Sequence, residues 1–187
     1  MLNTQYETDR LILTASSPDL TPAVADYLNR NRLFLAPTEP TRDELYYTEA
    51  FQRQQLLHDA QCYSRQSEVR LWVAKRQRPE RIIGMVHLSG IVLGCFRSCF
   101  LGYKLDQAEQ NRGYMTEAVA RLVRIAFEQL DLHRIEANVM PRNLPSLRVV
   151  EKLGFENEGV ARAYLKICGK WEDHIHMVLL RPDSPAR

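Results

Sequence analysis

The order of apolar and polar residues in the first half of the chain predicts a strand, a helical region and three further strands. Residues 10–15 (RLILTA) alternate between polar and apolar, which is typical of a half-buried strand. The connections between the three later strands are too short for parallel crossovers, so we expect an antiparallel meander. The predicted elements are a strand at 10–15, a helix ending near Asn31, a loop at 35–41, one or two helices over 43–64, and strands at 69–75, 82–93 and 98–105 around a charged turn at 75–81.

The second half of the chain alternates between helices and strands. Residues 114–130 carry apolar side chains at helical spacing. Asn143 suits the N-cap of a short helix over 143–153, which Gly154 ends. Strands are predicted at 133–139, 155–162 and 170–180. These elements predict an α/β (α+β) fold in a single domain over residues 1–187, with a mixed, mostly antiparallel sheet of six or seven strands flanked by helices.

Composition narrows the class of protein. The 187 residues are 45% apolar, and 25 basic against 23 acidic residues leave a net charge of +2, which excludes a polycation that binds nucleic acid by bulk charge. The apolar runs are far shorter than the ~18 residues of a membrane span, and we expect a cytoplasmic protein without a leader peptide or a membrane partner. The four cysteines are expected to be reduced and mostly buried, and Trp72 and Trp171 to lie in the core.

The junction between residues 101 and 118 carries the candidate chemistry. A strand enters a polar loop that opens a helix, and the first turn of a helix offers unpaired N–H groups and a favourable dipole to an anion. Gly113 allows the backbone to approach a phosphate closely, and Arg112 brings a guanidinium. The chain has neither a GxGxxG nor a GxxxxGK[ST] motif, which argues against a dinucleotide fold and a P-loop. Spacing alone supports a phosphate loop and a plain turn equally.

Two motifs in this half resemble those of the GNAT N-acetyltransferases. Gln110, Gly113 and Met115 fall on the fixed positions of the family's acetyl-CoA motif Q/R-x-x-G-x-G/A, with Met115 in place of the small last residue. Residues 143–146 (NLPS) and 151–156 (EKLGFE) resemble the N-x-x-S … E-K-x-G-F signature. The segments 8–13, 31–40, 133–138 and 169–174 extend the resemblance to the RimJ/RimL branch over essentially the whole chain.

The resemblance implies a site in a fork between two splayed strands. The loop N–H groups hold the pyrophosphate of acetyl-CoA, the strand at 101–105 pairs with the pantetheine arm, and a backbone N–H of that strand stabilises the oxyanion. No metal is expected, because His174, His176 and Cys168 do not make a converging set of ligands. The implied cofactor-binding residues are Tyr103, Leu105, Gln110, Asn111, Arg112, Gly113, Tyr114, Met115, Thr116 and Asn143.

The acid and the base are open at this point. Relatives carry a tyrosine where this chain has Val150, a glutamate on the strand where it has residues 99–101 (CFL), and another where it has Leu165. Ser146 is an alternative proton donor or a plain first-turn residue. The remaining candidates for the base are Glu39, Asp173, His174 and His87, and a route through water needs none of them. Glu117, in the first turn of a helix, is expected only to compensate the dipole.

The branch implies transfer of acetyl from acetyl-CoA to the α-amino group of a ribosomal protein, most closely to the N-terminal alanine of a small-subunit protein, with a possible transient ribosome contact. One alternative is the same chemistry on a polyamine or an antibiotic. Another is a ribosome-assembly or RNA-binding factor that keeps the fold without catalysis. The sequence does not indicate an oligomeric state.

Overall fold

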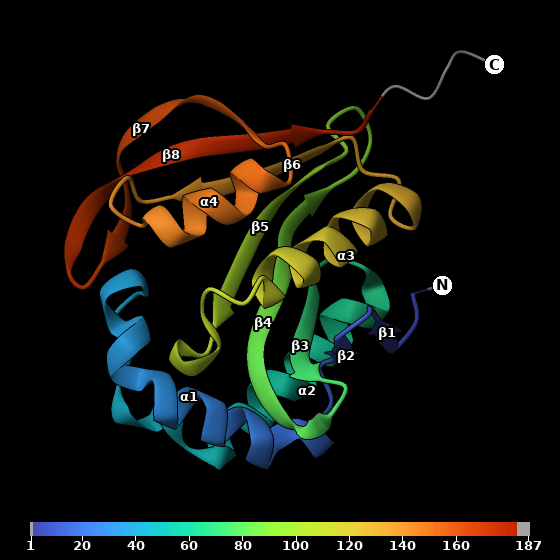
Figure 1. Cartoon of the computed structure of the whole chain (residues 1–187), viewed down its shortest axis with the longest axis vertical. Coiled ribbons are helices and arrows are strands. Elements are labelled where there is room, and N and C mark those ends of the chain that lie inside the picture. The colour runs from blue at the N-terminus through green and yellow to red at the C-terminus, as the bar shows by residue number, and fades with distance from the viewer. Residues whose placement is uncertain (1, 183–187) are drawn as a thin grey trace.

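The computed structural model describes residues 2–182, which form an eight-stranded sheet in the order β1-β2-β3-β4-β5-β6-β8-β7 with four α-helices packed on it (Figure 1). The strands are β1 Gln5–Glu7, β2 Leu11–Ala15, β3 Val69–Lys75, β4 Arg78–Val92, β5 Ser98–Leu105, β6 Arg134–Val139, β7 Glu156–Ile167 and β8 Lys170–Leu180. The helices are α1 Thr21–Leu35, α2 Glu49–Arg65, α3 Tyr114–Glu128 and α4 Leu144–Lys152, with short 3₁₀ turns at Pro18–Leu20, Ala36–Thr38, Glu44–Tyr47 and Gln107–Glu109.

The mixed, mostly antiparallel sheet predicted from the sequence is confirmed. Every neighbouring pair of strands is antiparallel except β5 and β6, which are parallel. The predicted count of six or seven strands misses β1, which has three residues and pairs with β2 alone. The charged turn is shorter than predicted, because β4 already begins at Arg78. None of the helices within residues 2–182 combines the length and apolar character needed to cross a membrane.

Both faces of the sheet are covered. On one face, the apolar stripe of α3 packs on the sheet, with Val119, Leu122 and Ala126 fully buried. On the other face, α1 and α2 enclose a smaller core in which the rings of Tyr27 and Trp72 meet edge to face at 6.2 Å. Alternate residues of the central strands therefore enter two different cores, which explains the nearly continuous burial of β3.

Two expectations about burial are wrong. Trp171 is 64% exposed on β8, whereas Trp72 is buried as expected. The four free cysteines are not mostly buried: Cys99 is buried, Cys62 is half-buried, and Cys95 and Cys168 are exposed. Trp171 and Cys168 both belong to the β7–β8 hairpin, where β7 forms the edge of the sheet and is largely exposed. Side chains of a strand are buried only where a second layer packs on the sheet. The sequence pattern of this hairpin does not reveal that no such layer covers these residues.

The central feature of the fold is the divergence of β5 from β6. The two strands pair through three residue pairs, from Ser98↔Arg134 to Phe100↔Glu136. Beyond this point β5 continues along β4 as far as Leu105↔Gly84, and β6 continues along β8 as far as Val139↔Ile175. The splayed strand pair expected from the sequence resemblance is thereby confirmed.

The approach of β4 to β5 depends on a glycine. A Cβ atom on Gly84 would lie 2.7 Å from the carbonyl oxygen of Lys104, which is backbone and cannot move aside. We expect Gly84→Ala to lower the free energy of unfolding by about 1–3 kcal/mol through overpacking. Gly102→Ala, on the neighbouring strand, is the matched control: a Cβ there meets nothing within 4 Å, so stability should stay within about 1 kcal/mol of wild type. Urea unfolding of both variants checks this, and equal losses would contradict it.

Candidate active site

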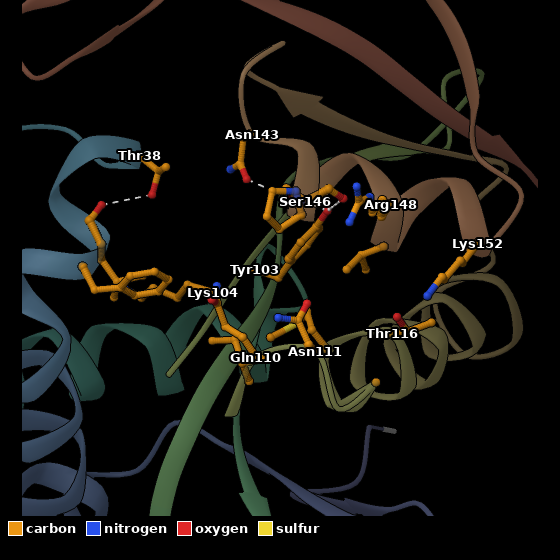
Figure 2. Close-up of a pocket in the computed structure, with 17 residues that line it drawn as sticks. Thr38, Tyr103, Lys104, Gln110, Asn111, Thr116, Asn143, Ser146, Arg148 and Lys152 are labelled. Carbon is orange, nitrogen blue, oxygen red and sulfur yellow. Dashed lines mark hydrogen bonds between the residues drawn. The ribbon is translucent and has the colours of Figure 1, made fainter. Parts of the chain in front are cut away.

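A cavity of about 450 Å³ lies in the fork between β5 and the segment that leads into α4 (Figure 2). Its floor is formed by the end of β5 and by the first turn of α3, and its roof by α4. The end of α1 closes one side with Phe34, Leu35 and Thr38. The volume and the mixture of apolar walls with a few polar groups are typical of a pocket for a small molecule.

The loop before α3 presents backbone N–H groups to this cavity. Asn111 and Gly113 both have positive φ, at 59° and 77°, and Gly113 is the N-cap of α3. Because glycine has no side chain to cap the helix, the N–H groups of the first turn, at Tyr114, Met115 and Thr116, stay available. These N–H groups lie at the positive end of the α3 dipole. This end of the cavity is therefore suited to an anion.

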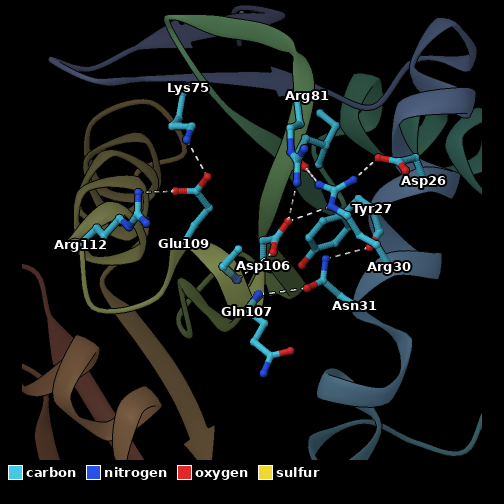
Figure 3. A network of polar contacts seen from close by, with 12 residues as sticks. Asp26, Tyr27, Arg30, Asn31, Lys75, Arg81, Asp106, Gln107, Glu109 and Arg112 are labelled. Carbon is cyan, nitrogen blue, oxygen red and sulfur yellow. Dashed lines mark hydrogen bonds and ion pairs between the residues drawn. The ribbon is translucent and has the colours of Figure 1, made fainter.

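Polar anchors from distant parts of the chain hold the loop in place (Figure 3). Asp106 accepts a hydrogen bond from Arg30 Nε at 2.8 Å, and Asn31 Oδ1 accepts one from the Gln107 N–H at 3.0 Å. Glu109 accepts a hydrogen bond from Lys75 Nζ at 2.6 Å. Burial alone would raise the pKa of Asp106, but the hydrogen bonds from Arg30 and from the Ala108 N–H outweigh it and lower the pKa. The start of the loop is thus tied to α1 and β3.

The end of the loop is tied to the N-terminal segment through Glu117. Its Oε1 accepts hydrogen bonds from Thr8 Oγ1 at 2.6 Å and from the Arg10 N–H at 3.0 Å, and its Oε2 accepts one from Arg10 Nε at 2.6 Å. Arg10 Nη1 donates in turn to the carbonyl of Arg112 at 2.9 Å. The sequence suggested only that Glu117 compensates the helix dipole. The structure shows that it also fixes the loop that opens its own helix.

The structure brings together most of the predicted cofactor-binding residues. All of them line the cavity except Arg112 and Tyr114. The side chain of Arg112 is exposed and lies 3.5 Å from Glu109, and the Tyr114 ring packs under the guanidinium of Arg10 at 4.7 Å. The sequence missed two basic residues that do line the cavity, Arg148 and Lys152 on α4. Their spacing of four residues places them on one helix face, which is the signal that could have revealed them.

The divergence of the strands leaves one edge of β5 without a strand partner. The Asp106 N–H donates to the Ile83 carbonyl on the β4 side, and backbone groups alternate in direction along a strand. The N–H groups of Tyr103 and Leu105 therefore point to the side of β6, beyond the last β5–β6 pair at Phe100. These groups are open to a ligand that lies in the fork.

A second cavity of about 600 Å³ opens on the face of the sheet that α1 and α2 cover. We call it the acceptor groove, after the role proposed for it below. It is lined by residues of that face such as Gln52, Trp72 and Met85. The cavity in the fork and the acceptor groove share five lining residues: Thr38, Tyr103, Lys104, Asn143 and Ser146. The two spaces therefore meet through the fork.

The predicted catalytic residues lie in different environments. Ser146 lines both spaces, and its hydroxyl donates to Tyr103 Oη at 2.8 Å. Glu39 lines the acceptor groove and accepts a hydrogen bond from Lys104 Nζ at 2.8 Å. Asp173 is exposed on β8 and accepts from the Ala163 N–H at 2.8 Å, where it supports an irregular turn of β7 at which Ala163 has a φ of 48°. The structure thus joins Ser146 and Glu39 to the groove and keeps Asp173 apart from it.

Two histidines also line the groove. His87 Nε2 lies 2.9 Å from Glu68, and its pKa is lowered by burial and by Arg70 in spite of that carboxylate. His174 is buried, and because the Glu172 carbonyl can only accept, Nδ1 donates to it at 3.0 Å. Cys168 lies apart from both, with its thiol 2.9 Å from the Ala36 carbonyl. Within residues 2–182, no group of three or more His, Cys, Asp or Glu side chains is arranged to hold a metal ion.

The Glu117 anchor predicts a pH-dependent contribution to stability. Burial alone would raise the pKa of Glu117, but the hydrogen bonds from Thr8 and Arg10 hold it below the usual glutamate value. A lowered native pKa stabilises the fold above the usual value and loses this effect as the pH falls through the lowered one. Glu117→Gln should cost about 1 kcal/mol at pH 7, and the difference from wild type should shrink toward pH 3.

The matched control is Glu128→Gln on the exposed face at the other end of α3. Its stability should follow wild type at every pH. Urea unfolding between pH 7 and pH 3 measures both variants, and a Glu117→Gln difference that stays constant with pH would contradict the assignment.

Comparisons with known proteins agree with this geometry. Residues 10–156 match the model of the acetyltransferase (GNAT) domain. The "Probable N-acetyltransferase YjcK" of Bacillus subtilis (strain 168) is 43% identical over 83% of this chain and 86% of its own length. The [Ribosomal protein uS5]-alanine N-acetyltransferase of Escherichia coli (strain K12) is 37% identical over 96% of this chain and 93% of its own length.

A solved structure shows the same fold. The ribosomal-protein-S5-alanine acetyltransferase from Vibrio fischeri superposes with a TM-score of 0.92 at 33% identity, over 97% of this chain and 98% of its own. A family model that covers most of the chain and relatives of this identity and coverage settle the family. The chain belongs to the GNAT family, in its RimJ/RimL branch, and is an acetyl-CoA-dependent N-acetyltransferase.

Proposed function

We propose that the chain acetylates the N-terminal α-amino group of a small-subunit ribosomal protein, with alanine as the acceptor residue. Two relatives that match nearly the whole chain, at 37% and 33% identity, are named ribosomal-protein alanine acetyltransferases. The reaction is proposed for the cytoplasm, where ribosomal proteins are made, and would need only a transient contact with the ribosome or with the free protein.

The lining of the acceptor groove is the observation that carries this proposal. Glu39 is the one acidic residue among the described residues that line the groove, and Lys104 already pairs with it. A polyamine site needs several carboxylates to balance the ammonium groups of its substrate. The groove instead offers amide, hydroxyl and aromatic side chains such as Gln52, Gln55 and Tyr46, which suit the backbone of an extended peptide.

In the proposed complex, acetyl-CoA lies in the fork. The pyrophosphate rests on the loop of Gln110, Asn111 and Gly113 and on the first-turn N–H groups of α3. The amides of the pantetheine arm pair with the open edge of β5, and Asn143 lines the same space. The thioester then faces the junction with the groove, where Ser146 lies.

The reaction requires a neutral amine, a held thioester and a stabilised oxyanion. An α-amino group titrates near pH ~8, so part of it is already neutral at physiological pH. The groove and the fork bring the amine and the thioester together, which replaces an encounter in solution by a fixed geometry. An N–H on the open edge of β5 is proposed as the donor to the oxyanion.

The placement of acetyl-CoA can be tested with two glycine variants. Acetyl-CoA at 100 times its Kd should stabilise the wild-type chain by about 2.7 kcal/mol. Gly113→Trp should abolish this stabilisation because the indole fills the loop that holds the pyrophosphate. Gly94→Trp is the control, since Gly94 has a similar positive φ of 72° with nothing near its Cβ and lies in the β4–β5 turn, outside the cavity. Thermal unfolding with and without ligand measures both, and equal responses would count against the site.

The acceptor can be tested with peptides. We expect mass spectrometry to show one added acetyl group at the α-amino end of a peptide that begins with the N-terminal alanine of ribosomal protein uS5. The same peptide with a blocked N-terminus and a polyamine serve as controls and should stay unmodified. Turnover of the polyamine at a rate similar to the peptide, or an unchanged uS5 N-terminus in cells that lack the gene, would overturn the proposed acceptor.

A further inference from the structure

Two hydroxyl groups meet at the junction of the fork and the acceptor groove. Tyr103 extends from β5 toward α4, and its hydroxyl donates to the carbonyl of Ser146 at 2.8 Å (Figure 2). The hydroxyl of Ser146 donates back to Tyr103 Oη at 2.8 Å. Both side chains line both spaces. They therefore stand between the position proposed for the amine and the position proposed for the thioester.

The reaction must move one proton across this junction. Attack by a neutral amine leaves a positive charge on nitrogen, and departure of the thiol group leaves a negative charge on sulfur. The carboxylate of Glu39 is already engaged by Lys104 Nζ at 2.8 Å. Val150 is fully buried in the core and supplies no proton donor. Ser146 and Tyr103 are hydrogen-bonded to each other, and both side chains line both spaces.

We propose that Ser146 and Tyr103 form a proton relay that carries the proton of the attacking amine to the departing thiolate. The inference rests on the proposed placement of acetyl-CoA in the fork, but not on the identity of the acceptor protein. Neither residue serves as a lasting acid or base, because each receives a proton as it gives one away.

The relay balances as one step. The amine nitrogen forms a bond to the acetyl carbon, and the carbon–sulfur bond breaks with its electron pair going to sulfur. The nitrogen proton passes to Ser146 Oγ, the Ser146 proton passes to Tyr103 Oη, and the Tyr103 proton passes to sulfur after rotation of the hydroxyl away from the Ser146 carbonyl. The products are an amide and a free thiol, and both side chains are neutral again.

The environment of Tyr103 suits this role. Burial raises the pKa of its phenol to about 12, although the hydrogen bond from Ser146 opposes the rise. The phenol is thus protonated at neutral pH and acts as donor and acceptor at once. A thiol has a pKa near ~8.5, so Tyr103 would not surrender its proton to a thiolate without a replacement. Ser146 Oγ–H already points at Tyr103 Oη and can supply that replacement.

The test compares Tyr103→Phe, Ser146→Ala and the double variant with the wild-type chain. The acceptor is whichever amine wild type acetylates fastest among an alanine peptide, a serine peptide and spermidine. Each single variant should lower kcat about 10²-fold, and the KM for acetyl-CoA should change less than about threefold. The double variant should be no slower than the slower single variant, because one relay can be broken only once.

Two controls separate the relay from a structural role. Tyr63→Phe removes another buried hydroxyl that makes two hydrogen bonds, with Asn3 and Tyr6 and away from both spaces, and should keep wild-type kcat. The dependence of kcat on the fraction of D₂O should be curved for wild type, because more than one proton moves, and straight for Tyr103→Phe.

The failures are distinguishable. A wild-type chain that shows no stabilisation by acetyl-CoA overturns the proposed cofactor site and the relay with it. Normal binding of acetyl-CoA with a kcat for Tyr103→Phe or Ser146→Ala within threefold of wild type overturns the relay alone and favours a base elsewhere, such as His174. Losses that multiply in the double variant also overturn the relay, since they indicate two independent roles.

Discussion

The parallel pairing of β5 with β6 ends after three residue pairs, and both the fork and the acceptor groove depend on that ending. Each strand remains paired on its outer side, β5 with β4 and β6 with β8, so the divergence costs the sheet few hydrogen bonds. The inner edge of β5 loses its strand partner at the N–H groups of Tyr103 and Leu105, which lie beyond the last β5–β6 pair. Backbone groups without partners are costly in a protein interior. A ligand with amide groups of its own would restore these hydrogen bonds, which is the role proposed for the pantetheine arm of acetyl-CoA.

The loop before α3 is held by ion pairs that also set the charge around it. Asp106, Glu109 and Glu117 each bind a basic partner from the first half of the chain: Arg30, Lys75 and Arg10. These pairs cancel much of the side-chain charge on the outer side of the loop while they fix its backbone. On the inner side, the fixed N–H groups and the α3 dipole favour an anion and need no rearrangement when one binds. This arrangement also explains why the Arg112 side chain lies outside the cavity, next to Glu109.

The sequence predicts elements better than it predicts contacts. Strands at 69–75 and 98–105 are found with the predicted bounds, because alternation and flanking turns are local signals. β1 is missed because three residues are too few to show a period. The exposure of Trp171 and Cys168 is missed because burial depends on whether another layer covers the hairpin. Motif spacing locates the loop at 110–116, but the Glu117–Arg10 anchor joins residues 107 apart in sequence, and periodicity says nothing about such partners.

At the junction of the fork and the groove, too, the sequence does not reveal which polar residues meet. The sequence resemblance implies a tyrosine where this chain has Val150 and a glutamate where it has Leu165. Val150 is fully buried, whereas Leu165 lines the acceptor groove. Both side chains are apolar, so neither can donate or accept a proton. The polar groups at the junction come instead from β5 and α4, through Tyr103 and Ser146, which are 43 residues apart. The hydroxyl groups at the junction are thus placed by the meeting of β5 with α4 rather than by the position of Val150.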